Sequence, residues 1–323
     1  MRIGSLAAEP GSKVFGRLTA TETHGRFPVE IPFHIVRGAT DGPTLLVHAG
    51  FSGLEIEPAM VLPSIVKELD PALMRGNLLM VPLLNTSGFE FEQVRSVWDD
   101  ADLNSLGAGR SDGTVSQRLL HVYAQELVAR ADALLDIRTG AQWFYHCYAA
   151  TYANGPRAAA EALAVDLGLE HVVSGLPADA TLSSALADSG RCVVTAWIGG
   201  GPGLRDYRSE DQDRMRQAVL NALRHLGILS DAVAGTRAHL LRAGSPVQMP
   251  AERGLVFMHY EKRGQRVDAG ETIGIVRHPF TGQTIANVVA PHAGVMLHAG
   301  AVWPLVPEGT PLAMIGVPAD TDA

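Results

Sequence analysis

Side chains capable of nucleophilic, acid–base or anion-binding chemistry follow three apolar runs of this chain. Ser52 and Glu55 come directly after the run 43–50, and Arg138 and Trp197 stand at the ends of two later runs. A carboxylate beside a guanidinium can bind an anionic ligand, and a serine in a strand-to-helix turn can serve as a nucleophile. Because active-site loops of α/β sheets emerge at strand ends, these runs predict one site at a sheet edge.

The pattern around these residues predicts an α/β fold. Short apolar runs that end in small residues read as buried strands, and longer periodic segments read as helices. A polar loop over residues 85–114 is long enough to predict a functional role. In chain order, the predicted elements are a strand at 43–50, a helix at 56–69, a strand at 78–84, a helix at 115–130, a strand ending at 136–140, a strand at 193–197 and a helix at 206–226.

Four motifs in this order resemble the succinylglutamate desuccinylase/aspartoacylase family, deacylases built on the zinc carboxypeptidase fold. The segments are Ser52-Gly53-Leu54-Glu55, Asp102-Leu103-Asn104-Ser105, Asp136-Ile137-Arg138-Thr139-Gly140 and Thr195-Ala196-Trp197-Ile198-Gly199. The corresponding family motifs are His-Gly-Asp/Asn-Glu, Asp-Leu-Asn-Arg, Asp-Leu-His-Thr-Gly and Thr-Val-Glu-Leu-Gly. The resemblance covers nearly the whole chain and implies a mixed-sheet, phosphorylase/hydrolase-like domain.

The resemblance also shows where the chain departs from the family's metal site. The family's two zinc histidines fall on Ser52 and Arg138, and only the metal-binding glutamate is retained, as Glu55. A catalytic zinc site of this class needs three protein ligands, and a guanidinium offers hydrogen-bond donors only. We therefore expect no zinc and no other cofactor at this place. We expect instead an ion pair between Arg138 and Glu55.

The substrate-binding and proton-transfer positions differ as well. The family's Asn-Arg pair becomes Asn104-Ser105, while the upstream arginine of the loop is matched by Arg95. The family's general base falls on Trp197, which cannot accept a proton. The resemblance implies that Arg95, Asn104 and Arg138 would bind the ligand.

Two alternatives keep a catalytic role open. A relocated zinc site could use His48 or His146 with Glu55, and His146 lies in the aromatic segment 143–148, where Tyr145 could line the pocket. Ser52 in Gly50-Phe51-Ser52-Gly53 could be a nucleophile, but the elbow motif lacks its last glycine, and a turn serine suits the position. The catalytic candidates are thus Ser52, Glu55, Arg138 and His146.

The C-terminal sequence differs from the rest of the chain in its pattern of apolar and turn residues, and this difference predicts a second domain. From residue 240 onward, short apolar runs alternate with glycine and proline turns, which predicts a small sheet or barrel. The segments 264–270 and 290–294 resemble the half-barrel of biotinyl and lipoyl domains. We therefore divide the chain into a deacylase-like α/β domain over 1–235 and a β-rich half-barrel domain over 236–323.

Composition limits the classes of partner. With 46% hydrophobic residues in 323, the chain can bury a full core. A net charge of −8 without a basic cluster predicts neither nucleic-acid nor membrane binding. The absence of a long apolar stretch predicts a cytoplasmic protein. Cys147 and Cys192 lie in apolar runs and are expected to be reduced thiols.

Three functions remain compatible with these features. The chain could be a repurposed, metal-independent member whose pocket takes a small carboxylate-bearing or acyl-amino-acid-type ligand. It could be a catalytically silent pseudoenzyme that binds a metabolite or a protein partner. It could also be a zinc-dependent amide or ester deacylase with relocated ligands. The resemblance further implies a homo-oligomer.

Overall fold

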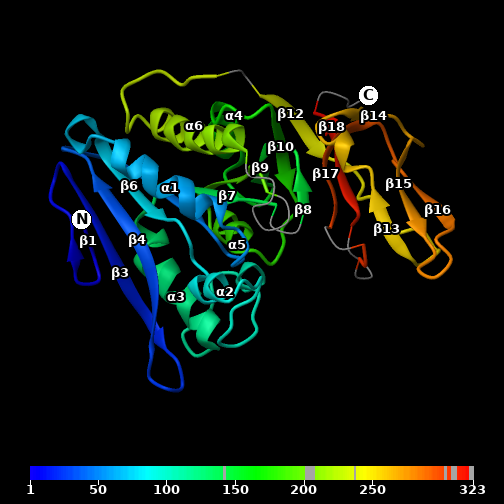
Figure 1. The fold of residues 1–323 in the computed structure, drawn as a ribbon. Helices are drawn as coiled ribbons and strands as arrows, with labels where there is room; N and C mark the ends of the chain where they lie inside the picture. The colour runs from blue at the N-terminus through cyan, green and yellow to red at the C-terminus, as the bar shows by residue number, and fades with distance from the viewer. Residues whose placement is uncertain (141–142, 201–207, 236–237, 302–303, 307–310, 320–323) are drawn as a thin grey trace.

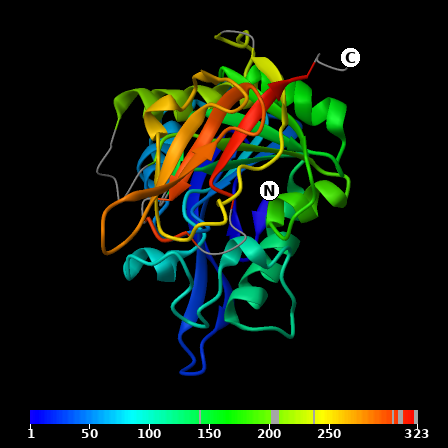
Figure 2. The same cartoon turned by 90° about the vertical axis from the view of Figure 1, so that its right-hand side faces the viewer.

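The computed structural model of the protein is a mixed α/β structure with a β-rich C-terminal part (Figure 1). It describes residues 1–323 except 141–142, 201–207, 236–237, 302–303, 307–310 and 320–323. Helices lie on both faces of a large twisted sheet, and the C-terminal strands lie at one end of that sheet (Figure 1). Figure 2 views the molecule from the side of these C-terminal strands, and both views show the turn between the first two long strands projecting from the body.

In the described part of the chain, thirteen strands form the large sheet. They are β3 (Ser12–Glu22), β4 (Pro28–Arg37), β5 (Thr40–Ala49), β6 (Arg75–Val81), β7 (Ala133–Arg138), β8 (Trp143–Tyr145), β9 (Tyr148–Tyr152), β10 (His171–Leu176), β11 (Cys192–Trp197), β12 (His239–Ala243), β14 (Arg266–Val267), β17 (Gly294–Ala301) and β18 (Ala313–Pro318). Their spatial order is β14-β17-β18-β12-β10-β9-β11-β7-β5-β6-β4-β3, and β8 pairs with β17.

The direction of the central strands determines at which edge of the sheet the candidate site residues lie. Strands β6, β5, β7 and β11 run parallel to one another, so their carboxyl ends share one edge of the sheet. Strand β9 runs antiparallel to β11, while β10 and β12 run parallel to β9. The amino-terminal ends of β9, β10 and β12 therefore lie at that same edge.

Among the described residues, six α-helices accompany the large sheet. They are α1 (Glu57–Glu68), α2 (Thr86–Glu90), α3 (Val115–Glu126), α4 (Arg157–Asp166), α5 (Leu182–Asp188) and α6 (Ser209–His225). The start of α3 is fixed by a capping box in which Thr114 and Gln117 satisfy each other's backbone N–H groups. Side chains of a strand point alternately to the two faces of the sheet, so each face has its own hydrophobic core. Val47 and Leu135 pack with α1, α4 and α6, whereas Leu46 and Leu134 pack with α3 and α5.

The C-terminal part adds a smaller sheet over its own core. Strands β13 (Leu255–Met258), β15 (Thr272–Arg277) and β16 (Thr284–Val289) pair antiparallel in the order β13-β15-β16. The core of this part includes Ile273, Val276 and Met296. A short pair, β1 (Arg2–Ile3) and β2 (Leu6–Ala7), completes the strands at the N-terminus.

The predicted α/β class and the predicted β-rich tail are confirmed. The division at residues 235 and 236 stays a prediction, because β12 pairs with β10 on one side and with β18 on the other. The large sheet therefore runs across the proposed boundary. None of the helices in the described ranges is both long and apolar enough to be a membrane span.

Candidate functional site

One cavity of about 310 Å³ lies at the edge where the parallel strands end. Ser52 and Glu55 follow β5, Arg138 ends β7 and Trp197 ends β11, and the strand pairing places Arg138 directly beside Trp197. The lining residues are Ser52, Glu55, Val94, Asp102, Asn104, Asp136, Arg138, Thr139, Gly140, Tyr152, Leu176, Asp179, Thr181, Thr195 and Trp197. The sheet edge therefore gathers the residues that the sequence places at strand ends.

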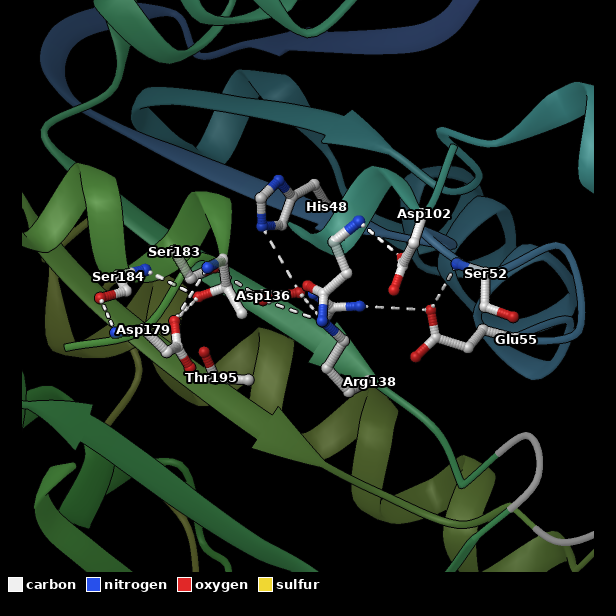
Figure 3. Close-up of polar contacts among 12 residues, drawn as sticks. His48, Ser52, Glu55, Asp102, Asp136, Arg138, Asp179, Ser183, Ser184 and Thr195 are labelled. Carbon is white, nitrogen blue, oxygen red and sulfur yellow. Dashed lines mark hydrogen bonds and ion pairs between the residues drawn. The ribbon is translucent and has the colours of Figure 1, made fainter. Parts of the chain in front are cut away.

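Arg138 is the centre of the polar contacts in this cavity. Its Nη1 lies 3.5 Å from Glu55 Oε2, so the predicted ion pair is confirmed. Its Nε lies closer to Asp136, 3.0 Å from Oδ1, and its Nη2 donates to Asn104 Oδ1 in a short hydrogen bond. Figure 3 shows Arg138 with Asp136 on one side and Glu55 on the other. The guanidinium also lies over the Phe51 ring, 4.4 Å from its centroid.

Burial and charge act against each other at this ion pair. The side chains of Arg138 and Glu55 are 8% and 6% exposed. Burial alone would lower the pKa of Arg138, but Asp136 and Glu55 raise it above its ordinary value, so the guanidinium stays charged. Burial raises the pKa of Glu55, against the opposing effects of Arg138 and of the Ser52 N–H, which donates to Oε2 at 3.1 Å. Arg138 is therefore the main influence that favours the ionised form of Glu55 against the effect of burial.

Asp136 joins this ion pair to the core of the sheet. Its Oδ2 accepts a hydrogen bond from Ser183 Oγ at 2.7 Å, and its Oδ1 lies 3.5 Å from His48 Nε2. His48 Nδ1 lies 2.6 Å from the Tyr123 hydroxyl, and burial lowers the pKa of His48 to about 4. A neutral imidazole between Tyr123 and Asp136 is a structural group of the core. His48 is not among the residues that line the described cavity.

Ser52 has the contacts of a turn residue. Its Oγ accepts a hydrogen bond from the Leu54 N–H at 3.2 Å, and its carbonyl oxygen accepts one from the Glu55 N–H at 3.1 Å. Its described hydrogen bonds include no imidazole. A nucleophilic serine requires an adjacent general base. The structure therefore gives Ser52 the role of ordering the turn that carries Glu55.

Asn104 lies in the cavity, but the other residues predicted from the loop and the aromatic segment do not join it in the described structure. Arg95 is half exposed and pairs with Asp100, its Nε 2.9 Å from Oδ1. Ser105 donates to the Asp102 carbonyl oxygen at 2.9 Å. The side chain of Tyr145 lies outside the described part of the structure, although its backbone pairs with that of His298. His146 lines a separate cavity, which Glu55 does not line.

Several lining residues were missed by the sequence-based prediction. Asp136, Asp102 and Asp179 give the cavity three further carboxylates beside Glu55, against Arg138 as the guanidinium among its lining residues. Tyr152 also lines it, its hydroxyl 3.0 Å from Thr195 Oγ1. The signal for Asp136 was present, because residues two apart on a strand share a face. Asp179 carries no local signal, since it lies in a loop before α5.

The donor set at the positions assigned to zinc ligands does not fit zinc. Ser52 offers a hydroxyl, Glu55 is paired with a cation, and the Arg138 guanidinium has no lone pair to donate. Among the described residues, one group of three histidine or acidic side chains is close enough to hold a metal ion, and it consists of His146, Glu170 and His171. Neither His48 nor Glu55 belongs to it. The described structure thus gives no support to a relocated site built on Glu55.

Comparisons with known proteins agree with this architecture. A family model described as "Succinylglutamate desuccinylase/Aspartoacylase catalytic domain" matches residues 41–226. A deacetylase of N-alpha-acetyl-L-2,4-diaminobutyric acid from Halomonas elongata is 27% identical over 179 residues, which are 54% of this chain and 52% of that protein. The match thus spans about half the length of that relative.

Solved structures share the fold over almost the whole chain. A succinylglutamate desuccinylase/aspartoacylase from Rhodobacter sphaeroides has a TM-score of 0.86 at 22% identity, with 100% of both chains covered. The product-bound ectoine utilization protein EutE (DoeB) from Ruegeria pomeroyi has a TM-score of 0.81 at 23% identity, covering 97% of this chain and 98% of that one. The predicted zinc-carboxypeptidase-like fold with a β-rich C-terminal part is thereby confirmed.

Proposed function

Because the chain belongs to the succinylglutamate desuccinylase/aspartoacylase family of hydrolases, we propose that its cavity binds a small acyl-amino-acid-type ligand without a zinc-bound water. The observation that carries this proposal is the position of Arg138. Its guanidinium contacts Glu55, Asp136 and Asn104, and the motif resemblance assigns its position to a zinc histidine of the family. Glu55 is thereby engaged by a protein cation, and Trp197 stands where the family has its general base.

Arg138 still has donors for a ligand. A guanidinium carries five N–H groups. The described hydrogen bonds of Arg138 use one on each nitrogen, toward Asp136, Glu55 and Asn104. Two N–H groups are not used by these described hydrogen bonds and can donate to an anionic group of a ligand. Charge-assisted hydrogen bonds of this kind are about twice as strong as neutral ones, so a ligand carboxylate is the natural partner.

The acidic residues that line the cavity place a second requirement on the ligand. Glu55 and Asp136 are both paired with Arg138, but Asp102 and Asp179 also line the cavity. A ligand with a carboxylate alone would meet their repulsion, whereas one that also carries an amino group would be attracted by them. The Halomonas elongata relative is named for such a compound, N-alpha-acetyl-L-2,4-diaminobutyric acid. We therefore favour an acyl-amino acid that bears both a carboxylate and a free amine.

Calorimetric titration with three matched compounds tests this proposal. The compounds are N-acetyl-2,4-diaminobutyrate, N-acetyl-2-aminobutyrate, which lacks the amine, and the carboxamide of the first, which lacks the carboxylate. We expect removal of either charged group to weaken binding by about tenfold or more, the value of one ionic contact of about 1.4 kcal/mol. Equal binding of all three, or binding of none, would refute the ligand class.

Two variants connect the amine preference to the cavity. Asp179→Asn should weaken binding of the amine-bearing compound and leave the amine-free one unchanged. Asp188→Asn is the matched control, because Asp188 is exposed at the end of α5 and does not line the cavity. Acetate release from N-acetyl-2,4-diaminobutyrate should be negligible with and without added zinc. If turnover depended on zinc and were abolished by Glu55→Gln, the proposal of a metal-independent cavity would be overturned.

A further inference from the structure

A row of side chains crosses four strands at the edge that holds the cavity. Trp197 on β11 is in register with Tyr148 on β9, and Tyr148 is in register with His171 on β10. His171 is in turn in register with His239 on β12. The Trp197 and Tyr148 rings stack at 4.9 Å, and the His171 and His239 rings lie 5.9 Å apart. The row leads from the cavity toward a cluster of imidazoles.

The cluster consists of His146, Glu170 and His171. His146 Nε2 lies 3.2 Å from His171 Nδ1 and 3.6 Å from Glu170 Oε2. One ligand atom from each residue can be chosen so that all lie within 4.8 Å of one another. Around a tetrahedral zinc ion with bonds of about 2.0–2.2 Å, ligand atoms are about 3.3 Å apart. The two distances to His146 Nε2 are close to that spacing.

Burial favours the neutral form of both imidazoles in the cluster. Burial, followed by the charge of His171, lowers the pKa of His146. Burial likewise lowers the pKa of His171, against the opposing effect of Glu170. Metal binding needs neutral imidazole. The lowered pKa values favour this neutral form at both positions.

The fold holds the first imidazole in place. The backbone N–H of His146 donates to the Leu297 carbonyl oxygen of β17 at 2.7 Å. Gly264 packs against the ring, and a Cβ at that position would lie 2.5 Å from His146 Nδ1. The C-terminal part thus turns Nε2 toward His171, which lies in β10 and is 5% exposed. Ligands fixed by packing lose little conformational entropy on binding.

A second cavity borders two of the three residues of the cluster, His146 and Glu170. It has a volume of about 470 Å³ and is lined by His146, Glu170 and His239, together with Cys147 and Arg214. Arg214 is paired with Asp211, Nη1 to Oδ1 at 2.7 Å, which reduces its repulsion of a cation. Burial raises the pKa of Cys147 to about 11, so its thiol is not counted as a ligand. No lining residue is shared with the cavity around Arg138.

We propose that His146, Glu170 and His171 bind a divalent first-row transition-metal ion, with His239 at the rim as a further imidazole. Two or three imidazoles and a carboxylate suit zinc and its neighbours, whereas magnesium and calcium prefer oxygen ligands. The site is independent of the proposed ligand cavity. It lies two strands away from Trp197 along the same row.

Titration of the full chain with zinc tests the site. Tag-free protein is stripped with a chelator and titrated with ZnCl₂ by calorimetry, and with CoCl₂ by visible absorption. We expect one equivalent to bind and cobalt to give the intense absorption of a tetrahedral N/O site. Glu170→Gln, an exposed position that should fold normally, is expected to weaken binding by at least tenfold, and His146→Gln to abolish saturable binding.

His24→Gln, at an exposed histidine remote in sequence from the cluster, is the control and should bind as the unaltered chain does. The proposal fails if no saturable binding occurs, or if His146→Gln and Glu170→Gln bind as the unaltered chain does. Glu55→Gln separates the two sites. Metal lost in Glu55→Gln but kept in His146→Gln would place the ion in the Arg138 cavity, and would refute both this proposal and the metal-independent function.

Discussion

Replacing Arg138 with methionine is the most direct test of how the cavity is held together. The change keeps an extended side chain of similar length but removes the cation between Glu55 and Asp136. Removing one partner of a buried ion pair typically costs about 3–5 kcal/mol, because the remaining charge has neither solvent nor partner. Arg138 is 7% exposed and serves two carboxylates. We therefore expect Arg138→Met to lower the free energy of unfolding by that amount at pH 7.

The loss should depend on pH, and the sign follows from Glu55. Its pKa in the folded protein is already raised by burial, and Arg138 is the main influence that lowers it. Without Arg138, the folded pKa rises further above the unfolded value of about 4.3. A group whose folded pKa is raised contributes stability below its unfolded pKa and loses it as pH rises through the folded pKa. The deficit of Arg138→Met should be smallest near pH 4 and largest at pH 7.

Urea unfolding followed by far-ultraviolet circular dichroism at pH 4.5 and pH 7 measures both effects. Arg95→Met is the matched control, because the Arg95–Asp100 pair is exposed and such pairs contribute about 0–1 kcal/mol. The double variant Arg138→Met/Glu55→Gln should recover part of the loss at pH 7. A deficit below about 1 kcal/mol, or one that is equal at both pH values, would refute the idea that Arg138 neutralises buried carboxylates.

Two further substitutions test the surroundings of the cavity. Tyr123→Phe removes the hydroxyl 2.6 Å from His48 Nδ1 and leaves a buried polar atom unsatisfied. Urea unfolding should therefore show a free energy of unfolding lower by about 1–3 kcal/mol. Unchanged stability would contradict a structural role for this pair. Trp197→Ala removes a ring stacked on Tyr148 and enlarges the cavity, so we expect a loss of about 1–3 kcal/mol and tighter calorimetric binding of compounds with longer acyl groups. Weaker binding of those compounds would show that the indole contacts the ligand instead of limiting its size.

Periodicity and turn signals in the sequence were enough to predict the elements that carry the site. The strand predicted at 43–50 is β5 (Thr40–Ala49), and the helix predicted at 56–69 is α1 (Glu57–Glu68). The helix predicted at 115–130 ends earlier, because α3 stops at Glu126 and a 3₁₀ turn follows. Since the predicted strands run parallel, their ends had to meet, and so Glu55 and Arg138 could be paired in advance.

Contacts that depend on loop conformation or on sheet order were not predictable from sequence. Arg95 lies in the loop that supplies Asn104, yet a local pair with Asp100 holds it at the surface. The cluster at His146 and His171 requires β9 and β10 to be neighbours and β9 to run against β11. Such an order cannot be derived from the periodicity of single segments, because each strand shows only which face it buries.

The contacts of Arg138 also bear on how this protein can evolve. A zinc site of the kind that the family motifs describe would need histidine at two positions, 52 and 138. Arg138→His alone would leave Glu55 and Asp136 with a weaker partner, and Ser52→His alone would place an imidazole beside a guanidinium. Each single step passes through a less stable protein, although the final metal site could compensate for the loss. The ion pairs of Arg138 with Glu55 and Asp136 therefore oppose a stepwise change of this cavity into a metal-binding site.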